Sequence, residues 1–258
     1  MPFLPPRRIN LIEESTDGAG PFDTGLSHAV ALAVGTGEIG ESLRLHPTSE
    51  VVAFGRQDVL APGYRRAIAA ARSLGFEVVE RLAGGRAAVF HTGTLAFSWA
   101  MPAVDPRAGV HERFERLAGI MVDALTSLGA DARIGEVPGE YCPGAFSVNL
   151  GGRIKVMGVG QRLVKGAAHI GGVVVVSGSD RLREVLVPVY EALELEWVPG
   201  TAGSLEDELP GISIEDVRRA ILEEVRTYAE VTGEPLPLEV TEMGRRLSMT
   251  HRVNVAAV

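Results

Sequence analysis

The one cysteine of the sequence, Cys142, and one of its two lysines, Lys155, are the side chains best suited to covalent chemistry. Cys142 lies in the segment GEYCPG, whose composition is typical of a loop rather than of a core strand. A cationic neighbour stabilises a thiolate, and the thiolate is a nucleophile. An ammonium such as that of Lys155 can hold a carboxylate, a phosphate or the oxyanion of an acyl transfer. The alternatives are an unreactive cysteine and a surface lysine.

The scarcity of lysine makes Lys155 informative. Among the 25 basic residues only Lys155 and Lys165 are lysines, and all the others are arginines. Nucleotide bias in the encoding genome replaces lysine wherever a positive charge is sufficient, whereas a site that needs a compact charge on a flexible stem resists the exchange. Alternation in a predicted strand at 153–159 places Lys155 on the face opposite Ile154 and Val156. The hairpin that this strand forms is predicted to bring Lys155 into one cleft with Cys142.

A glycine-containing segment from Arg81 to His91 is the third candidate. Gly84 and Gly85 separate a predicted strand from an extended stretch, and glycines allow a ligand to approach the backbone, whose amides can face an anion. The flanking Arg81 and Arg86 favour a carboxylate or a phosphate. A tight turn without a ligand is the alternative.

Other motifs carry little weight. Residues 35–40 match G-x-G-x-x-G, but a helix-like stretch precedes them and an extended, proline-terminated one follows, so a helix-ending loop explains them better. The six histidines have no metal-ligand spacing, so no metal site is predicted, and no G-x-S-x-G elbow is present.

The composition bounds the class of protein. The chain has 258 residues, 46% of them hydrophobic, and a net charge of −8, which exclude a disordered chain and argue against nucleic-acid or anionic-lipid partners. A single cysteine forms no internal disulfide. No apolar run is long enough for a signal peptide or a membrane span, so a cytoplasmic location is predicted.

Periodicity and turn signals predict a mixed α/β protein. Helices are expected at 25–35, capped by Thr24, and at 65–75, 109–129, within 180–195, at 214–228 and after Pro237. Strands are expected at 42–46, 50–55, within 76–102, at 168–176 and in a hairpin formed by 146–150 and 153–159. Residues 1–20 are expected to be irregular, and 199–212 to be a linker or an exposed loop. We therefore expect a catalytic domain at 1–204 and a small helical appendage at 205–258.

Ordered segments of the chain resemble the lipoate-protein ligase and octanoyltransferase family, which shares its fold with the catalytic domain of biotin protein ligases. They are Ser42–Leu45, Val51–Arg56, the glycine segment with Arg81, Gly84, Gly85 and His91, then Gly93–Ser98, and Gly152–Gly158 with Gln161 and Arg162. Their order along most of the chain is more specific than any one of them. The resemblance implies a mainly antiparallel sheet with flanking helices.

The resemblance also assigns roles. It implies that Lys155 contacts the acyl carbonyl or the adenylate and that the loop from Arg81 to His91 walls a lipoyl or octanoyl pocket. The implied substrate-binding residues are Arg44, Arg81, Gly84, Gly85, Arg86, Ala87, His91, Gly93, Asn149, Gly158, Gln161 and His169. Departures from the pattern of many relatives are Glu80, Ala83, Arg86 and Thr92.

The branch within the family follows from the position of the cysteine. Cys142-Pro143-Gly144 is similar to the amidotransferase type, whereas a branch with its cysteine downstream of the lysine is disfavoured because that stretch reads GAAH here. The resemblance therefore implies an acyltransferase that moves an octanoyl or lipoyl group to the lysine of lipoyl-domain proteins through a Cys142 thioester, without a cofactor. Its protein partners would be the glycine cleavage H protein or the E2 lipoyl domain of a 2-oxoacid dehydrogenase.

Two alternatives remain open. The first is an ATP- and Mg²⁺-dependent lipoate-protein ligase acting through lipoyl-AMP, in which Cys142 is incidental. The second is a protein that binds lipoate or an acylated domain without catalysis.

Overall fold

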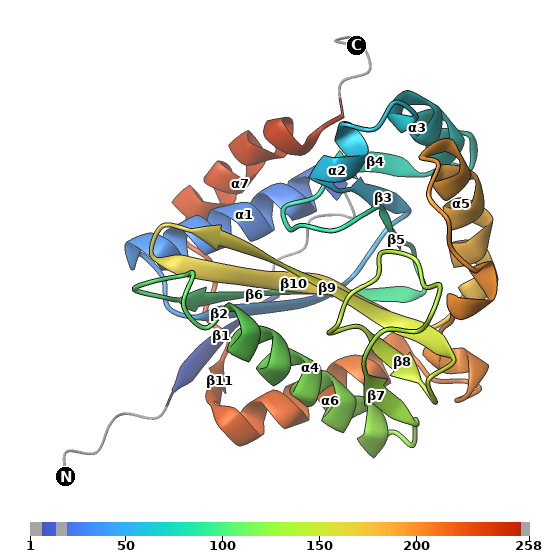
Figure 1. Cartoon of the computed structure of the whole chain (residues 1–258). Helices are drawn as coiled ribbons and strands as arrows, with labels where there is room; N and C mark the ends of the chain where they lie inside the picture. The colour runs from blue at the N-terminus through green and yellow to red at the C-terminus, as the bar shows by residue number, and fades with distance from the viewer. Residues whose placement is uncertain (1–6, 14–19, 254–258) are drawn as a thin grey trace.

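Two β-sheets organise residues 7–13 and 20–253, the part of the chain that the computed structural model describes (Figure 1). The larger sheet has eight strands in the order β11-β1-β2-β6-β10-β9-β8-β7. Strand β1 pairs in parallel with β11 and β2, and every other neighbouring pair is antiparallel, which confirms the mixed, mainly antiparallel sheet. The strands are β1 Arg8–Ile12, β2 Ser42–Pro47, β6 Thr94–Pro102, β7 Ala132–Ile134, β8 Val148–Leu150, β9 Ile154–Val164, β10 Ala167–Val175 and β11 Glu230–Thr232.

Helices cover both faces of the larger sheet (Figure 1). On one face lie α4 (Val110–Ser127) and α6 (Ile214–Tyr228), and on the other α1 (Gly20–Thr36) and α7 (Leu238–His251). The helix expected at 109–129 is confirmed as α4, and its apolar face is buried, because Leu117, Met121 and Leu125 are at most 1% exposed. Burial of each such side chain stabilises the fold by roughly 1.5–3 kcal/mol, so this face anchors α4 to the sheet.

The smaller sheet lies beside α1. Its strands are β4 (Glu77–Glu80), β3 (Val51–Phe54) and β5 (Ala88–Phe90), in that order. Helices α3 (Tyr64–Ser73) and α5 (Ser179–Ala192) cover it, and the short α2 (Arg56–Val59) follows β3. The opposite face of the small sheet therefore faces α1 and the larger sheet.

The predicted hairpin is confirmed. Strands β8 and β9 are antiparallel, and Gly151 and Gly152 connect them with φ angles of +57° and +72°. Such a turn needs positive φ at both positions, which glycine adopts without strain. Gly75, which follows α3, has a φ of +84°, and Pro188 lies inside α5.

The N-terminal prediction needs correction. Residues 8–12 form β1 instead of an irregular segment, and residues 1–6 and 14–19 of the predicted irregular stretch lie outside the described residues. Helix α1 begins at Gly20, earlier than expected, so Thr24 is not its cap; the Thr24 hydroxyl donates to the Gly20 carbonyl inside the helix. The extra turn points the start of α1 at the small sheet.

The expectation of a linker or exposed loop at 199–212 is wrong for residues 201–205, which are buried, whereas residues 199–200, 206–207 and 210–211 are exposed as expected. Ala202 and Leu205 are fully buried, and the Gly203 N–H donates to the carbonyl of Lys155. Two 3₁₀ turns, η1 (Pro199–Thr201) and η2 (Leu205–Asp207), carry the chain through this segment. The prolines and acidic residues of the segment lie in the turns on either side of the buried stretch, and none of them is buried.

Residues after 204 pack into the same layers as the rest. Strand β11 joins the larger sheet, α6 packs against α4, and α7 crosses α1. The α1–α7 crossing is close, because a Cβ on Gly25 would lie 2.5 Å from the carbonyl oxygen of Gly244. A functional division at residue 204 stays a prediction. None of the helices within the described ranges is both long and apolar enough to cross a membrane.

Candidate active site

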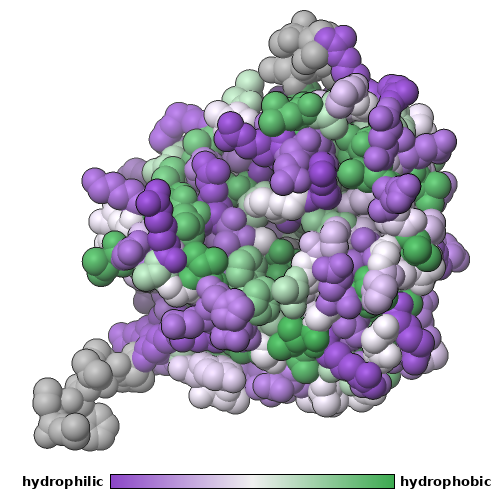
Figure 2. Space-filling model, in the orientation of Figure 1, coloured by the Kyte–Doolittle hydropathy of each residue, from purple (hydrophilic) through white to green (hydrophobic). Residues whose placement is uncertain are grey.

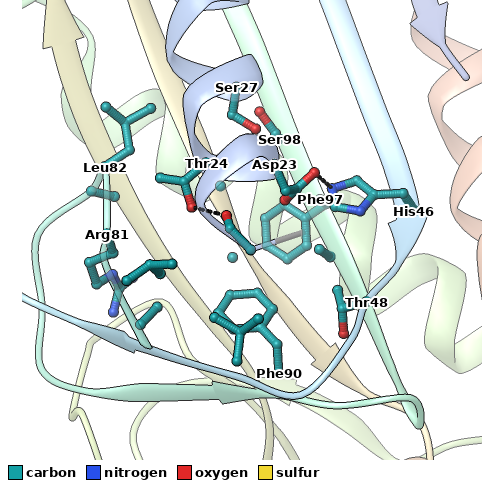
Figure 3. Close-up of a pocket in the computed structure, with 18 of the residues that line it drawn as sticks. Asp23, Thr24, Ser27, His46, Thr48, Arg81, Leu82, Phe90, Phe97 and Ser98 are labelled. Carbon is teal, nitrogen blue, oxygen red and sulfur yellow. Dashed lines mark hydrogen bonds and ion pairs between the residues drawn. The ribbon is translucent and has the colours of Figure 1, made fainter. Parts of the chain in front are cut away.

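A cavity of about 110 Å³ lies where the small sheet, the start of α1 and strands β6 and β10 meet (Figure 3). Alternation in β6 turns Ala96 and Ser98 toward α1, away from the core beneath α4. Val51, Ala53, Val79 and Phe90 of the small sheet supply an apolar wall. The remaining lining residues are Gly20, Asp23, Thr24, Ser27, His46, Pro47, Thr48, Ser49, Arg81, Leu82, Ala83, Phe97, His169, Gly171 and Gly172.

One end of the cavity is polar. The carboxylate of Asp23 accepts a hydrogen bond of 2.7 Å from the guanidinium of buried Arg44, and the His46 ring lies 3.4 Å from the same oxygen. Burial lowers the pKa of His46, and the Asp23 carboxylate opposes this effect. Figure 3 shows His46 and Arg81 on opposite sides of the cavity. The cavity therefore runs between a polar end and a cationic end.

His169 is a neutral wall residue. It is 4% exposed, and its Nε2 lies 2.9 Å from the hydroxyl of Ser98. Burial and, to a lesser extent, the positive charges of His28 and Arg44 lower the pKa of His169 to about 3. The ring is therefore uncharged near neutral pH and fits an apolar ligand.

Cys142 lies beside the cationic end, in the loop between β7 and β8. Its Sγ accepts a hydrogen bond of 3.2 Å from the backbone N–H of Arg86 and lies 3.9 Å from Nη1 of Arg81. Arg81 also lines the cavity, so its guanidinium is a neighbour of both the cavity and the thiol. Gly85 has a φ of +110°, and a Cβ there would lie 3.0 Å from Sγ. The glycine is thus required for the close approach of this loop to the sulfur.

A buried carboxylate supports the same loop. Asp58 of α2 has a fully buried side chain, which accepts hydrogen bonds from the Gly55 N–H at 2.9 Å and from the guanidinium of Arg86 at 3.3 Å. Burial raises the pKa of Asp58, while these two donors oppose the effect. Asp58 thereby fixes the residue whose amide contacts Sγ.

Lys155 is buried, so the surface-lysine alternative is wrong. It is 1% exposed, and its ammonium donates to Oε1 of Glu140 at 2.8 Å and to the carbonyls of Tyr141 at 3.0 Å and Cys142 at 2.7 Å. All three N–H donors are therefore used. The predicted proximity of Lys155 and Cys142 is confirmed, but the ammonium contacts the main chain of the cysteine, not its sulfur.

The predicted substrate-binding residues separate by location. Arg81 and His169 line the cavity, and Arg44 supports its polar end. Gly84 and Gln161 line a neighbouring open groove of about 830 Å³, on the other side of the glycine loop. Gly85 and Arg86 contact the thiol, and Gly158 lies against the side chain of Lys155.

Four further predicted residues, Ala87, His91, Gly93 and Asn149, contact neither the cavity nor the thiol. His91 follows Phe90, whose ring faces the cavity, and so turns the other way, where its Nδ1 accepts from the Gly93 N–H. The side chain of Asn149 bonds to the backbone of Gly135 and Gly152. The carbonyl of Ala87 accepts from the buried Tyr190 hydroxyl.

Sequence reasoning missed Glu140 and Asp58. Glu140 stands two residues before the cysteine. A buried ammonium requires a carboxylate partner, so a buried position for Lys155 would have indicated a nearby acidic residue such as Glu140. Asp58 had no comparable signal. In residues 7–13 and 20–253, no group of three His, Cys, Asp or Glu side chains is placed to hold a metal ion.

The fold, with a cysteine held next to a side chain that lines an apolar cavity, agrees with a match to a known family. Residues 22–226 match the lipoyl protein ligase A/B catalytic domain, and the chain belongs to that family. A bi-partite lipoate protein ligase from Thermoplasma acidophilum superposes with a TM-score of 0.71 at 19% identity over 94% of this chain and 92% of the other.

Two relatives by sequence have transferase names. The octanoyl-[GcvH]:protein N-octanoyltransferase of Geobacillus kaustophilus is 32% identical over 63% of this chain, and the chain spans only 57% of the length of that relative. The lipoyl-[GcvH]:protein N-lipoyltransferase of Listeria monocytogenes is 24% identical over 70% of this chain and 68% of its own.

Proposed function

We propose that this chain is an enzyme that transfers an octanoyl or lipoyl group to the lysine of lipoyl-domain proteins through a thioester on Cys142. The observation that carries the proposal is the position of Sγ, held by the Arg86 amide next to a guanidinium that lines an apolar cavity. The names of the Geobacillus and Listeria relatives support the same acyl groups and the H protein as donor. The E2 lipoyl domain as acceptor and a cytoplasmic location belong to the proposal.

The first half-reaction takes the acyl group from a lysine of the donor. The sulfur of Cys142 attacks the amide carbonyl, a C–S bond forms, and the C–N bond breaks. The thiol proton ends on the departing amine, so the products are the acyl-enzyme and a free lysine on the donor. The Arg86 N–H and the Arg81 guanidinium place positive charge next to the sulfur that attacks.

The second half-reaction reverses these bonds. The lysine amine of the acceptor attacks the thioester carbonyl, a C–N bond forms, and the C–S bond breaks to restore the thiol. No nucleotide takes part in either step. With the carbonyl at Cys142, the acyl tail extends past Arg81 into the cavity, where burial contributes about 0.8 kcal/mol per methylene. Short acyl groups are therefore selected against.

Intact-mass measurement tests the proposal. Incubation with octanoylated H protein is expected to give a hydroxylamine-labile octanoyl adduct on the wild-type chain and none on Cys142→Ala. ATP-dependent release of pyrophosphate from free lipoate, equal in wild type and Cys142→Ala, would overturn the proposal in favour of the ligase. Binding of lipoate with neither activity would overturn it in favour of a non-catalytic binding protein.

A further inference from the structure

We propose that Glu140 is a positioning residue for the acyl transfer, acting through Lys155 to hold the main chain at Cys142. The inference rests on the proposed use of Cys142 as the nucleophile. It concerns the loop between β7 and β8, which carries the thiol and is rich in glycine and proline. Backbone hydrogen bonds satisfy part of this loop, such as that from the Gly135 N–H to the Ser147 carbonyl, and side chains satisfy other backbone groups of it.

The Glu140 carboxylate connects both ends of this loop. Its Oε2 accepts from the Val137 N–H at 2.8 Å, and its Oε1 accepts from the Ser147 hydroxyl at 2.6 Å and from Lys155 at 2.8 Å. The side chain of Glu140 is 0% exposed. A buried carboxylate is tolerated because it is paired and fully hydrogen-bonded, and here those bonds close the loop on strand β9.

Lys155 connects Glu140 to the main chain of the cysteine. Its ammonium donates hydrogen bonds to two successive carbonyls, those of Tyr141 and Cys142, and lies 4.9 Å from the centre of the Tyr141 ring. Cys142 has a φ of +43°, and Glu194 is the one other non-glycine residue in the described ranges with positive φ. The left-handed conformation costs roughly 1–2 kcal/mol, so it persists where surrounding contacts impose it.

The irregular pairing of β8 with β9 directs Lys155 inward. The register shifts between Val148 and Asn149, so that Val148 pairs with Met157 and Asn149 with Lys155. Bulges re-aim side chains, and both Lys155 and its neighbour Val156 are buried here, against simple alternation. The carboxylate, the ammonium and the strained cysteine thus form one connected unit.

Two rates measured on the whole chain, those of cysteine alkylation and of thioester formation, distinguish an effect of Glu140 on the position of the sulfur from an effect on folding. The variants are Glu140→Ala, Glu140→Gln and, as matched control, Glu41→Gln, which alters another largely buried carboxylate, paired with Arg7 and hydrogen-bonded to Trp99. Alkylation by iodoacetamide reports access to the single cysteine. Formation of the Cys142 thioester from saturating octanoylated H protein reports alignment of the sulfur with an acyl group in the cavity. Urea denaturation identifies the folded fraction.

We expect Glu140→Ala to slow thioester formation on the order of a hundredfold, since small misplacements of a reacting atom have effects of that size. Alkylation should change far less, because iodoacetamide needs only an accessible thiol. Glu140→Gln keeps the shape and one acceptor oxygen and should recover part of the rate, while Glu41→Gln should match the wild type.

Equal thioester rates in Glu140→Ala and wild type would overturn the inference. So would a parallel loss of both rates in proportion to the unfolded fraction. If Glu140→Ala does not fold, Glu140→Gln decides by the same comparison. A wild-type chain that forms no adduct at all contradicts the proposed function instead, so the two failures are distinguishable.

Discussion

Replacement of His169 by glutamine tests the electrostatics of the cavity wall. The pKa of His169 is lowered to about 3 in the folded chain, against 6.5 as its ordinary value. Between these two values the unfolded chain binds a proton at this site that the folded chain does not, so stability is complete above pH 6.5 and falls as the pH decreases. The slope is about 1.4 kcal/mol per pH unit. From pH 7 to pH 5 the ring therefore contributes a loss of about 2 kcal/mol.

Urea denaturation at the two pH values measures this contribution. In His169→Gln the amide can still bond to Ser98, but the titration is absent, so the difference between the free energies of unfolding at pH 7 and pH 5 should shrink by about 2 kcal/mol. His111→Gln is the control, because His111 is a surface residue paired with Glu115. The same pH dependence in His169→Gln and wild type would refute the assignment of a neutral, buried ring.

Three further substitutions test the site. Gly85→Ala should slow thioester formation in the intact-mass assay, because its Cβ would meet the sulfur of Cys142 at 3.0 Å and because a φ of +110° strains alanine; an unchanged rate would contradict the contact. Ala96→Leu should shift preference from octanoyl toward shorter donors by filling the cavity, as competition between donors of two lengths would show. Lys155→Met should lower the free energy of unfolding by about 3–5 kcal/mol, since it leaves the carboxylate of Glu140 buried without its partner; addition of Glu140→Gln should restore part of this loss in urea denaturation.

Local signals predicted the elements that meet at the thiol. The double glycine specified the hairpin, and the short separation along the chain placed Lys155 near Cys142. Sequence periodicity does not report which face of a strand meets a cavity, and for this reason His91, expected in the pocket, turns away while Phe90 lines it. The direction depends on the neighbouring helix α1, which is distant in sequence.

Burial was the property that sequence patterns reported least well. Segment 199–212 has the composition of an exposed loop, yet Ala202 pairs with Lys155 and Leu205 enters the core. The contacts that bury residues 201–205 come from β9 and α5, and no local pattern records them. Glu140 was missed for the same reason. Its role follows from the burial of Lys155, and alternation along the strand does not tell whether the face that carries Lys155 is buried.

The close crossing of α1 and α7 has a consequence for synthesis of the protein. Asp23 and Thr24 line the cavity from α1, and the neighbouring Gly25 packs on Gly244 in α7. A nascent chain therefore completes the support of this cavity only after residues 238–251 have emerged from the ribosome. Translation that stops early would release a product with an unsupported pocket and an uncovered β1 edge, which proteases and chaperones recognise.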